Sequence, residues 1–139
     1  MCLSMELVPL DQYIKKNDVK DSVVSIYVHN RCTSLFMALT VQAKNQNDAE
    51  SIKFTNTARR AYSEMAVATG EIFSKSTKNP EIAIKQNGET IKRLLSAYLD
   101  YTNTVMDSGR NLEEDAFFDT EIKICGKLLN SIRQNRQSN

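Results

Sequence analysis

The sequence predicts an all-α protein, an antiparallel up-down-up-down four-helix bundle with an N-terminal arm. The chain has 139 residues but only 4 glycines and 2 prolines, which indicates few turns and long helices. Four segments, each roughly 25 to 29 residues long, carry apolar residues at helical spacing. Short connections between four matched helices are typical of such a bundle. We expect the arm over residues 1–17 and the bundle over residues 18–137.

The first helix is expected over residues 18–45 and the second from Asn47 to about Lys75. Asn47 can cap the second helix while Glu50 reaches back from the third helical position, a capping-box arrangement. No glycine or proline separates the two helices. The break between them therefore depends on this cap and on Asn45, which tolerates a left-handed conformation.

The third and fourth helices have clearer starts. Asn79 precedes Pro80, and proline suits the first helical position because its missing N–H has no partner there. This helix is expected to stop near Gly109. In the fourth, Asn111 and Glu114 repeat the capping-box spacing. We expect that helix to begin there and to run to the end of the bundle.

Rows of apolar residues at alternating steps of three and four predict nearly parallel helix packing. These rows are Phe54, Ala58, Ala61, Met65, Ala68 and Ile72 in the second helix, Ile84, Ile91, Tyr98 and Val105 beside Gly88, Leu95 and Thr102 in the third, and Phe118, Ile122, Cys125, Leu129 and Ile132 in the fourth.

The first helix carries two apolar stripes, whereas one is enough for a bundle core. The first stripe is Val24, Val28, Cys32, Leu35, Phe36, Leu39 and Ala43. The second stripe is Val19, Val23, Ile26, Tyr27, Met37 and Val41. We expect the second stripe to be covered by the N-terminal arm, by a second copy of the chain or by another partner, and we favour a dimer.

Composition argues against several functions. The net charge is +1 with acids and bases interspersed, so no strong field attracts nucleic acid or an anionic membrane. No apolar run is long enough to span a membrane. The N-terminus lacks the features of a signal peptide, and Cys2 follows no lipidation motif. These features indicate either a cytoplasmic protein or a mature or trimmed chain. The overall pattern is typical of a small bacterial or phage helical bundle.

No catalytic, metal or cofactor site is predicted. His29, the single histidine, lies between the two apolar stripes and is expected at the boundary of the core or on the surface. The three cysteines lack the short spacing of metal ligands. Glu121 belongs to an acidic group at a predicted helix start, where the helix dipole favours it. Tyr98 and Tyr101 are expected in the core with hydroxyls that reach its edge.

Cys32 and Cys125 are the pair most able to meet. Each lies near the middle of its helix and on the inward row, and the first and fourth helices are neighbours in the predicted bundle. A disulfide and two buried thiols are both open at this point. A disulfide would indicate an exported protein, and reduced thiols a cytosolic one.

Two classes of function remain. The first is a non-enzymatic interaction module that binds a protein partner or itself through a helix face. The second is a carrier of a small ligand or cofactor in a pocket between the helices. The second rests only on small residues in the helix rows, which more often allow close helix approach. A pocket lined by these residues would favour the carrier, and a packed core the interaction module.

Overall fold

The computed structural model describes residues 7–44 and 48–137, and these residues are almost entirely helical. The described elements are α1 (Leu10–Lys16), α2 (Ser22–Lys44), α3 (Ala49–Ser76), α4 (Pro80–Asp107), the 3₁₀ turn η1 (Leu112–Glu114) and α5 (Ala116–Gln137). The all-helical prediction is confirmed, and no strand occurs in this part of the chain.

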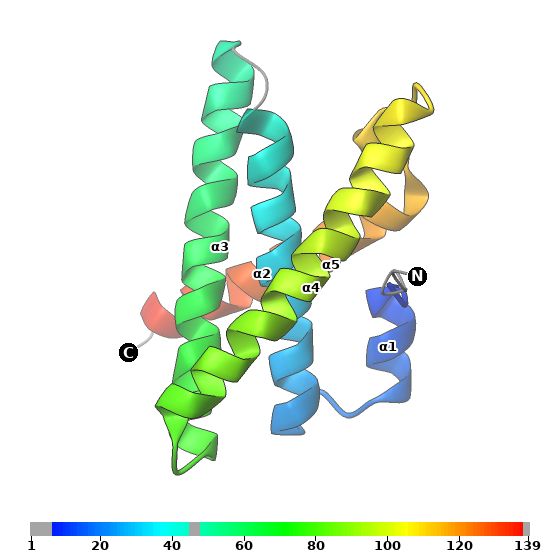
Figure 1. Ribbon diagram of the computed structural model, residues 1–139. Coiled ribbons are helices and arrows are strands. Elements are labelled where there is room, and N and C mark those ends of the chain that lie inside the picture. The colour runs from blue at the N-terminus through cyan, green and yellow to red at the C-terminus, as the bar shows by residue number, and fades with distance from the viewer. Residues whose placement is uncertain (1–6, 45–47, 138–139) are drawn as a thin grey trace.

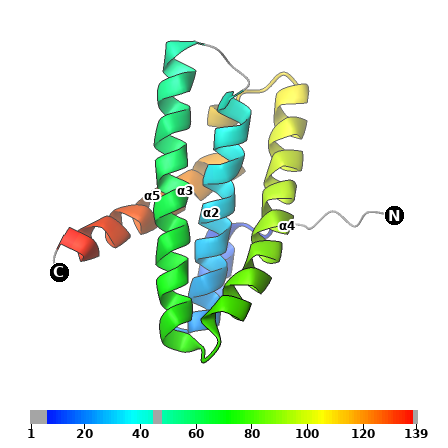
Figure 2. The ribbon, with the colours of Figure 1, turned by 60° about the vertical axis from the view of Figure 1, so that its left-hand side comes forward.

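Helices α2 and α3 run alongside each other, α4 crosses α2 obliquely on one side, and α5 crosses on the other (Figure 1). The chain passes up α2, down α3 and up α4, whereas α5 lies behind these helices and runs across them at a steep angle (Figures 1 and 2). Asn30 bonds to Asn87, and Gln42 bonds to Thr102, so α2 and α4 run in the same direction. The structure therefore confirms long helices but not the side-by-side packing predicted for the fourth.

Helix α2 is the centre of the molecule. Every residue from Val28 to Phe36 is buried, on all sides of the helix. This follows from its neighbours, because α3, α4 and α5 each pack against a different side of it (Figure 1). Most of the first stripe lies in this core, from Val28 to Leu39, whereas no residue of the second stripe is fully buried.

The N-cap of α3 lies one residue later than the sequence predicted. Asp48 is the N-cap, and its carboxylate accepts a hydrogen bond of 2.8 Å from the Ser51 backbone N–H. The predicted cap Asn47 and the predicted helix end Asn45 lie outside the described residues. The predicted start of the third long helix is confirmed, because α4 begins at Pro80 directly after Asn79.

The predicted start of the last helix is wrong. Asn111 precedes only the short turn η1, and α5 begins at Ala116. Asp115 accepts a 3.0 Å hydrogen bond from the Phe118 N–H, as an N-cap does. Its carboxylate also accepts from the Tyr101 hydroxyl at 2.7 Å, so the turn is tied to α4. The sequence favoured Asn111 because it shows capping spacing but not this tertiary bond.

Part of the predicted N-terminal arm forms helix α1. Its first residue, Leu10, is fully buried, and Tyr13 packs on Tyr27 of α2 with ring centroids 4.5 Å apart. Leu7 and Ile14 pack against the same core. The described part of the arm is therefore a structural element that covers α2 and α5.

Some predicted core rows are displaced because α4 and α5 diverge from ideal bundle packing. Ala58, Ala61 and Met65 of α3 are buried as expected, whereas Phe54 is 46% exposed. On α4, Ile84 is 47% exposed although its row faces α2. Tyr98, Thr102 and Val105 of the predicted rows are buried as expected, and Leu94, which lies outside those rows, is fully buried as well.

The burial along α4 gives a direct test of its register. Leu94→Ala should lower the free energy of unfolding by about 2–5 kcal/mol, because it leaves a cavity in a packed core. Leu95→Ala should cost less, because Leu95 is only partly buried. Chemical denaturation followed by circular dichroism measures both. A larger loss for Leu95→Ala than for Leu94→Ala would show that the helix is rotated from the orientation described.

Candidate functional site

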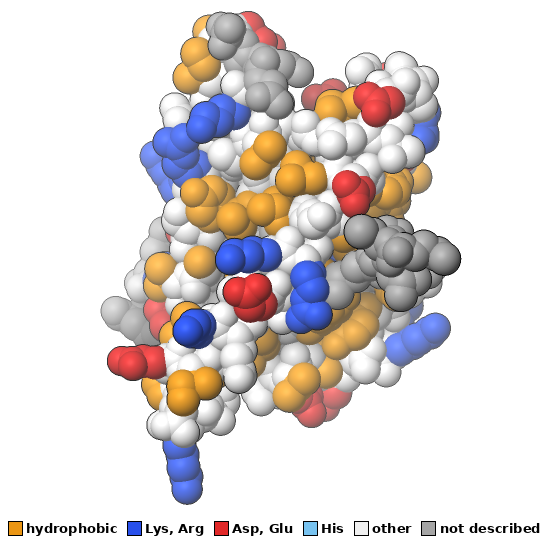
Figure 3. Space-filling view, in the orientation of Figure 1, with side chains coloured by type: hydrophobic (Ala, Val, Ile, Leu, Met, Phe, Trp, Pro, Cys, Tyr) orange, Lys and Arg blue, Asp and Glu red, His pale blue; other side chains and the backbone are white. Residues whose placement is uncertain are grey.

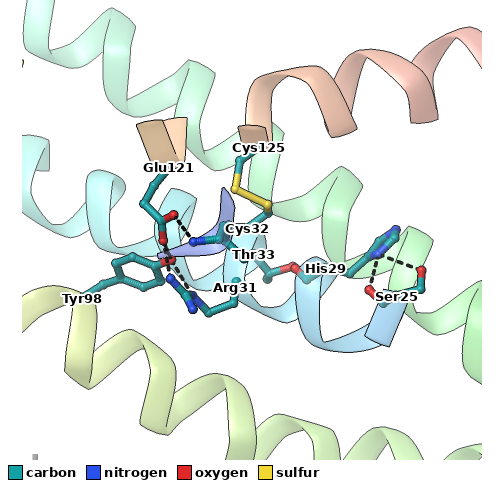
Figure 4. Close-up of a disulfide and its surroundings, with 9 residues drawn as sticks. Ser25, His29, Arg31, Cys32, Thr33, Tyr98, Glu121 and Cys125 are labelled. Carbon is teal, nitrogen blue, oxygen red and sulfur yellow. Dashed lines mark hydrogen bonds and ion pairs between the residues drawn. A yellow bond between two sulfur atoms is a disulfide. The ribbon is translucent and has the colours of Figure 1, made fainter. Parts of the chain in front are cut away.

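A disulfide joins α2 to α5 where these helices cross. The Cα atoms of Cys32 and Cys125 lie 5.3 Å apart, within the usual range for a disulfide, and both side chains are fully buried (Figure 4). The predicted closeness is therefore correct. The predicted reason is not, because α5 meets α2 by crossing it rather than by lying beside it.

A buried ion pair lies beside this disulfide. The Arg31 guanidinium donates to the Glu121 carboxylate, and both side chains are fully excluded from solvent. Arg31 precedes Cys32 in sequence, and Glu121 lies about one turn before Cys125 on α5. The same crossing is therefore held by a covalent bond and by an ion pair (Figure 4).

Tyr98 of α4 completes this cluster. Its hydroxyl accepts a 2.8 Å bond from Arg31 Nε and donates a 2.8 Å bond to Glu121 Oε1. Among the described residues, no buried side-chain N or O atom lacks a hydrogen-bond partner. A buried charge pair is stable only when its remaining donors and acceptors are satisfied, and this cluster meets that requirement.

The segment leading into α1 is bonded to the same two charges. The Leu10 N–H donates to Glu121 Oε2 at 2.9 Å, and the Val8 carbonyl accepts from Arg31 Nη1 at 2.7 Å. Arg31 Nη1 also donates to the Tyr27 hydroxyl at 3.1 Å. The buried cluster thus joins α1, α2, α4 and α5.

Electrostatics keep the cluster in one protonation state. Burial alone would lower the pKa of Arg31, but Tyr98 and Glu121 raise it above its ordinary value, so the guanidinium stays charged. Burial raises the pKa of Tyr98 well above that of a free tyrosine, so its hydroxyl stays protonated and can donate. A permanently charged donor and a protonated hydroxyl favour a structural role over proton transfer.

Sequence reasoning missed this cluster. The sequence places Glu121 in an acidic group at a predicted helix start, yet the side chain is fully buried between α2 and α5. Tyr98 lies in the core as expected, but its hydroxyl is bonded inside the core and does not reach its edge. The sequence did contain one indication of this burial. Glu121 lies four residues before Cys125, so the two side chains share the inward face of their helix.

The second stripe is split by the neighbouring helices, and its first residue, Val19, lies in a turn because α2 begins at Ser22 and not at the predicted residue 18. At the start of the stripe, Val19 is 49% and Val23 is 73% exposed, and at its far end Val41 is 42% exposed. Ile26, Tyr27 and Met37 are partly buried. Helix α1 covers Tyr27 but leaves Val19 and Val23 open to solvent.

His29 is more buried than expected. It is 8% exposed, and Nδ1 lies 2.7 Å from the Ser25 carbonyl oxygen. Burial lowers the pKa of His29 despite this bond, which acts in the opposite direction. The ring lines a depression of about 440 Å³ between α2, α3 and α5. In the described chain no group of three His, Cys, Asp or Glu side chains is placed to hold a metal ion.

None of the described helices combines the length and the apolar character needed to cross a lipid bilayer.

The disulfide gives a prediction for stability. In the chain-entropy model, the 93-residue separation of Cys32 and Cys125 corresponds to about 4–5 kcal/mol. Cys32→Ala/Cys125→Ala should therefore lower the free energy of unfolding by several kcal/mol relative to the oxidised parent. Cys2→Ala is the matched control and should leave it unchanged in reductant-free buffer. Two additional free thiols in the unfolded, unreduced parent would contradict the bond.

The buried histidine gives a prediction for pH dependence. Its pKa is lowered on folding, so the unfolded chain takes up a proton more readily as the pH falls below about 6.5. The parent should lose more stability than His29→Gln between about pH 7 and pH 5.5. Denaturant unfolding at each pH measures this difference. Equal losses in the two proteins would show that the histidine is not buried in its neutral form.

Known proteins supply no family for this chain. No family model matches it, and neither a curated protein nor a solved structure matches it. Its function must therefore be argued from its own surfaces and its own chemistry.

Proposed function

We propose that the protein is a non-enzymatic helical interaction module that pairs with a second copy of itself through one apolar face. This α2–α4 face consists of Val19 in the turn before α2, Val23 and Ile26 of α2, and Ile84 of α4. The observation that carries the proposal is the exposure of Val23, which at 73% is the most exposed large hydrophobic side chain in the described chain. Burying such side chains stabilises association by about 25 cal/mol per Å² of apolar surface.

The register of α2 and α4 supports treating these residues as one surface. Asn30 and Asn87 exchange hydrogen bonds of 2.7 and 2.8 Å where the two helices meet. Ile84 lies about one turn before Asn87, and Val23 lies about two turns before Asn30. Below this pair α4 turns toward the end of α3 (Figure 1), which leaves Ile84 and Val23 uncovered.

The charges around the face suit a second copy. Lys20 and Asp21 lie just before α2, beside its apolar residues, and Glu81 and Lys85 flank Ile84 on α4; all four are exposed. Figure 3 shows basic and acidic side chains interspersed over α4 and hydrophobic side chains exposed over the lower part of α2. A rim with both signs avoids the like-charge repulsion that would oppose pairing of identical surfaces. A two-fold axis would place the same patch on both copies in contact.

The disulfide supports a module that works in an oxidising compartment. Disulfides persist in exported proteins and are rare in reducing ones. The disulfide at the crossing of α2 and α5 would restrict the motion of α2, the helix that contains Val23. Preorganised surfaces bind with less loss of conformational entropy. We therefore place the proposed module outside the reducing cytoplasm.

The ligand-carrier alternative has less support. Three small residues of the predicted rows, Ala58, Ala61 and Thr102, are buried. Ala68, another small residue of those rows, lines the depression beside His29. The small residues thus favour close helix approach over an internal pocket.

Self-association is tested by light scattering after size-exclusion chromatography over a range of protein concentrations. The parent should have twice the monomer mass. Val23→Glu/Ile84→Glu should be a folded monomer, because two carboxylates would be buried in the interface. Val67→Glu is the matched control, since Val67 is 54% exposed on α3 outside the face, and it should remain dimeric. A monomeric parent at high concentration, or a double variant that stays dimeric, contradicts the proposal.

A further inference from the structure

The depression beside His29 lies on a different side of α2 from the α2–α4 face and has no part in the proposed pairing. Its volume of about 440 Å³ falls within the range of small-molecule sites. Residues of α2, α3 and α5 line it, and two ion pairs hold α5 across α3 at this point. Arg133 binds Glu64 at 2.6 Å, and Arg136 binds Glu71 at 3.3 Å.

We propose that this depression binds a small organic anion that has an apolar body and a hydroxyl or N–H donor. Three features of the lining select these three parts of the ligand: a pair of cations, an apolar wall and a histidine nitrogen that can accept a hydrogen bond.

The cations are Lys75 of α3 and Arg136 of α5. Arg136 uses Nη2 for its single, long bond to Glu71, which leaves further N–H groups on a guanidinium that has five. Lys75 forms no ion pair within the described residues. The two cations outnumber the single carboxylate of Glu71 in the lining, so the depression favours an anionic group.

The apolar wall comes from Ala68 and Ile72 of α3 and Ile132 of α5. Ala68 is buried, and the two isoleucines are partly exposed. These side chains offer a surface for an aliphatic or aromatic body. A free inorganic anion would leave that surface in water, so an organic anion fits better.

His29 supplies the hydrogen-bond acceptor. The Ser25 carbonyl can only accept, so Nδ1 at 2.7 Å must carry the proton and donate. In this tautomer Nε2 has a free lone pair. Figure 4 shows the ring with Nδ1 toward Ser25 and its other nitrogen turned away from that residue. A hydroxyl or N–H on the ligand would donate to Nε2.

The test uses 4-hydroxyphenylacetate, which combines a carboxylate, an aromatic body and a hydroxyl. Binding is followed by the NMR signal of the His29 Cε1 proton, which needs no assignment because the chain has one histidine. Phenylacetate lacks the hydroxyl, and 4-hydroxyphenylacetamide lacks the charge. We expect saturable binding of 4-hydroxyphenylacetate, with each of the two analogues binding at least several-fold more weakly.

Lys75→Gln should weaken binding of 4-hydroxyphenylacetate about tenfold, a change of about 1.4 kcal/mol. Lys53→Gln is the matched control, because Lys53 is an exposed lysine near the other end of α3, and it should bind as the parent does. Three results would each overturn the proposal: no saturable shift at millimolar probe, equal binding of the neutral amide, or equal affinities in Lys75→Gln and Lys53→Gln.

Discussion

The ion pair between Arg31 and Glu121 is the interaction on which the rest of this fold depends. It joins α2 to α5 in the core, and its remaining hydrogen-bonding groups are satisfied by Tyr98 of α4 and by the backbone leading into α1. Removing either charge would leave the other buried and unpaired, which typically costs about 3–5 kcal/mol. Four helices therefore share one electrostatic centre, and none of them can move without disturbing it.

This centre explains how a helix that crosses the others can be stably placed. Parallel helices bury long seams, whereas a steep crossing offers a short contact and little apolar area. At the crossing of α5 with α2, a disulfide and a charged hydrogen-bond network supplement the hydrophobic contact. Farther along α5, Arg133 bonds to Glu64 of α3 through two N–H groups. Specific bonds thus fix an orientation that packing alone would specify weakly.

Periodicity along the chain predicted the helices and the inward orientation of Cys32 and Cys125, because both depend on local spacing. The nearness of the two cysteines was predicted from side-by-side packing of the first and last helices, whereas the structure brings them together at a crossing. Periodicity did not predict the direction of α5, because alternating steps of three and four look the same in a parallel helix and in a crossing one. Glu121 was misassigned for a related reason: a single sequence does not reveal that a carboxylate has a buried arginine opposite it. The cap at Asp115 and the depression beside His29 likewise depend on tertiary contacts, which no local pattern encodes.

A double-mutant cycle on Arg31 and Glu121 tests the account most directly. The free energies of unfolding of Arg31→Met, Glu121→Leu and the double variant are measured against the parent in oxidising buffer. If the two charges form the centre described here, each single variant is strongly destabilised, and the double variant loses less than the sum of the singles by about 1–3 kcal/mol. Losses that simply add would contradict the account, because they would mean that the two side chains do not act on each other.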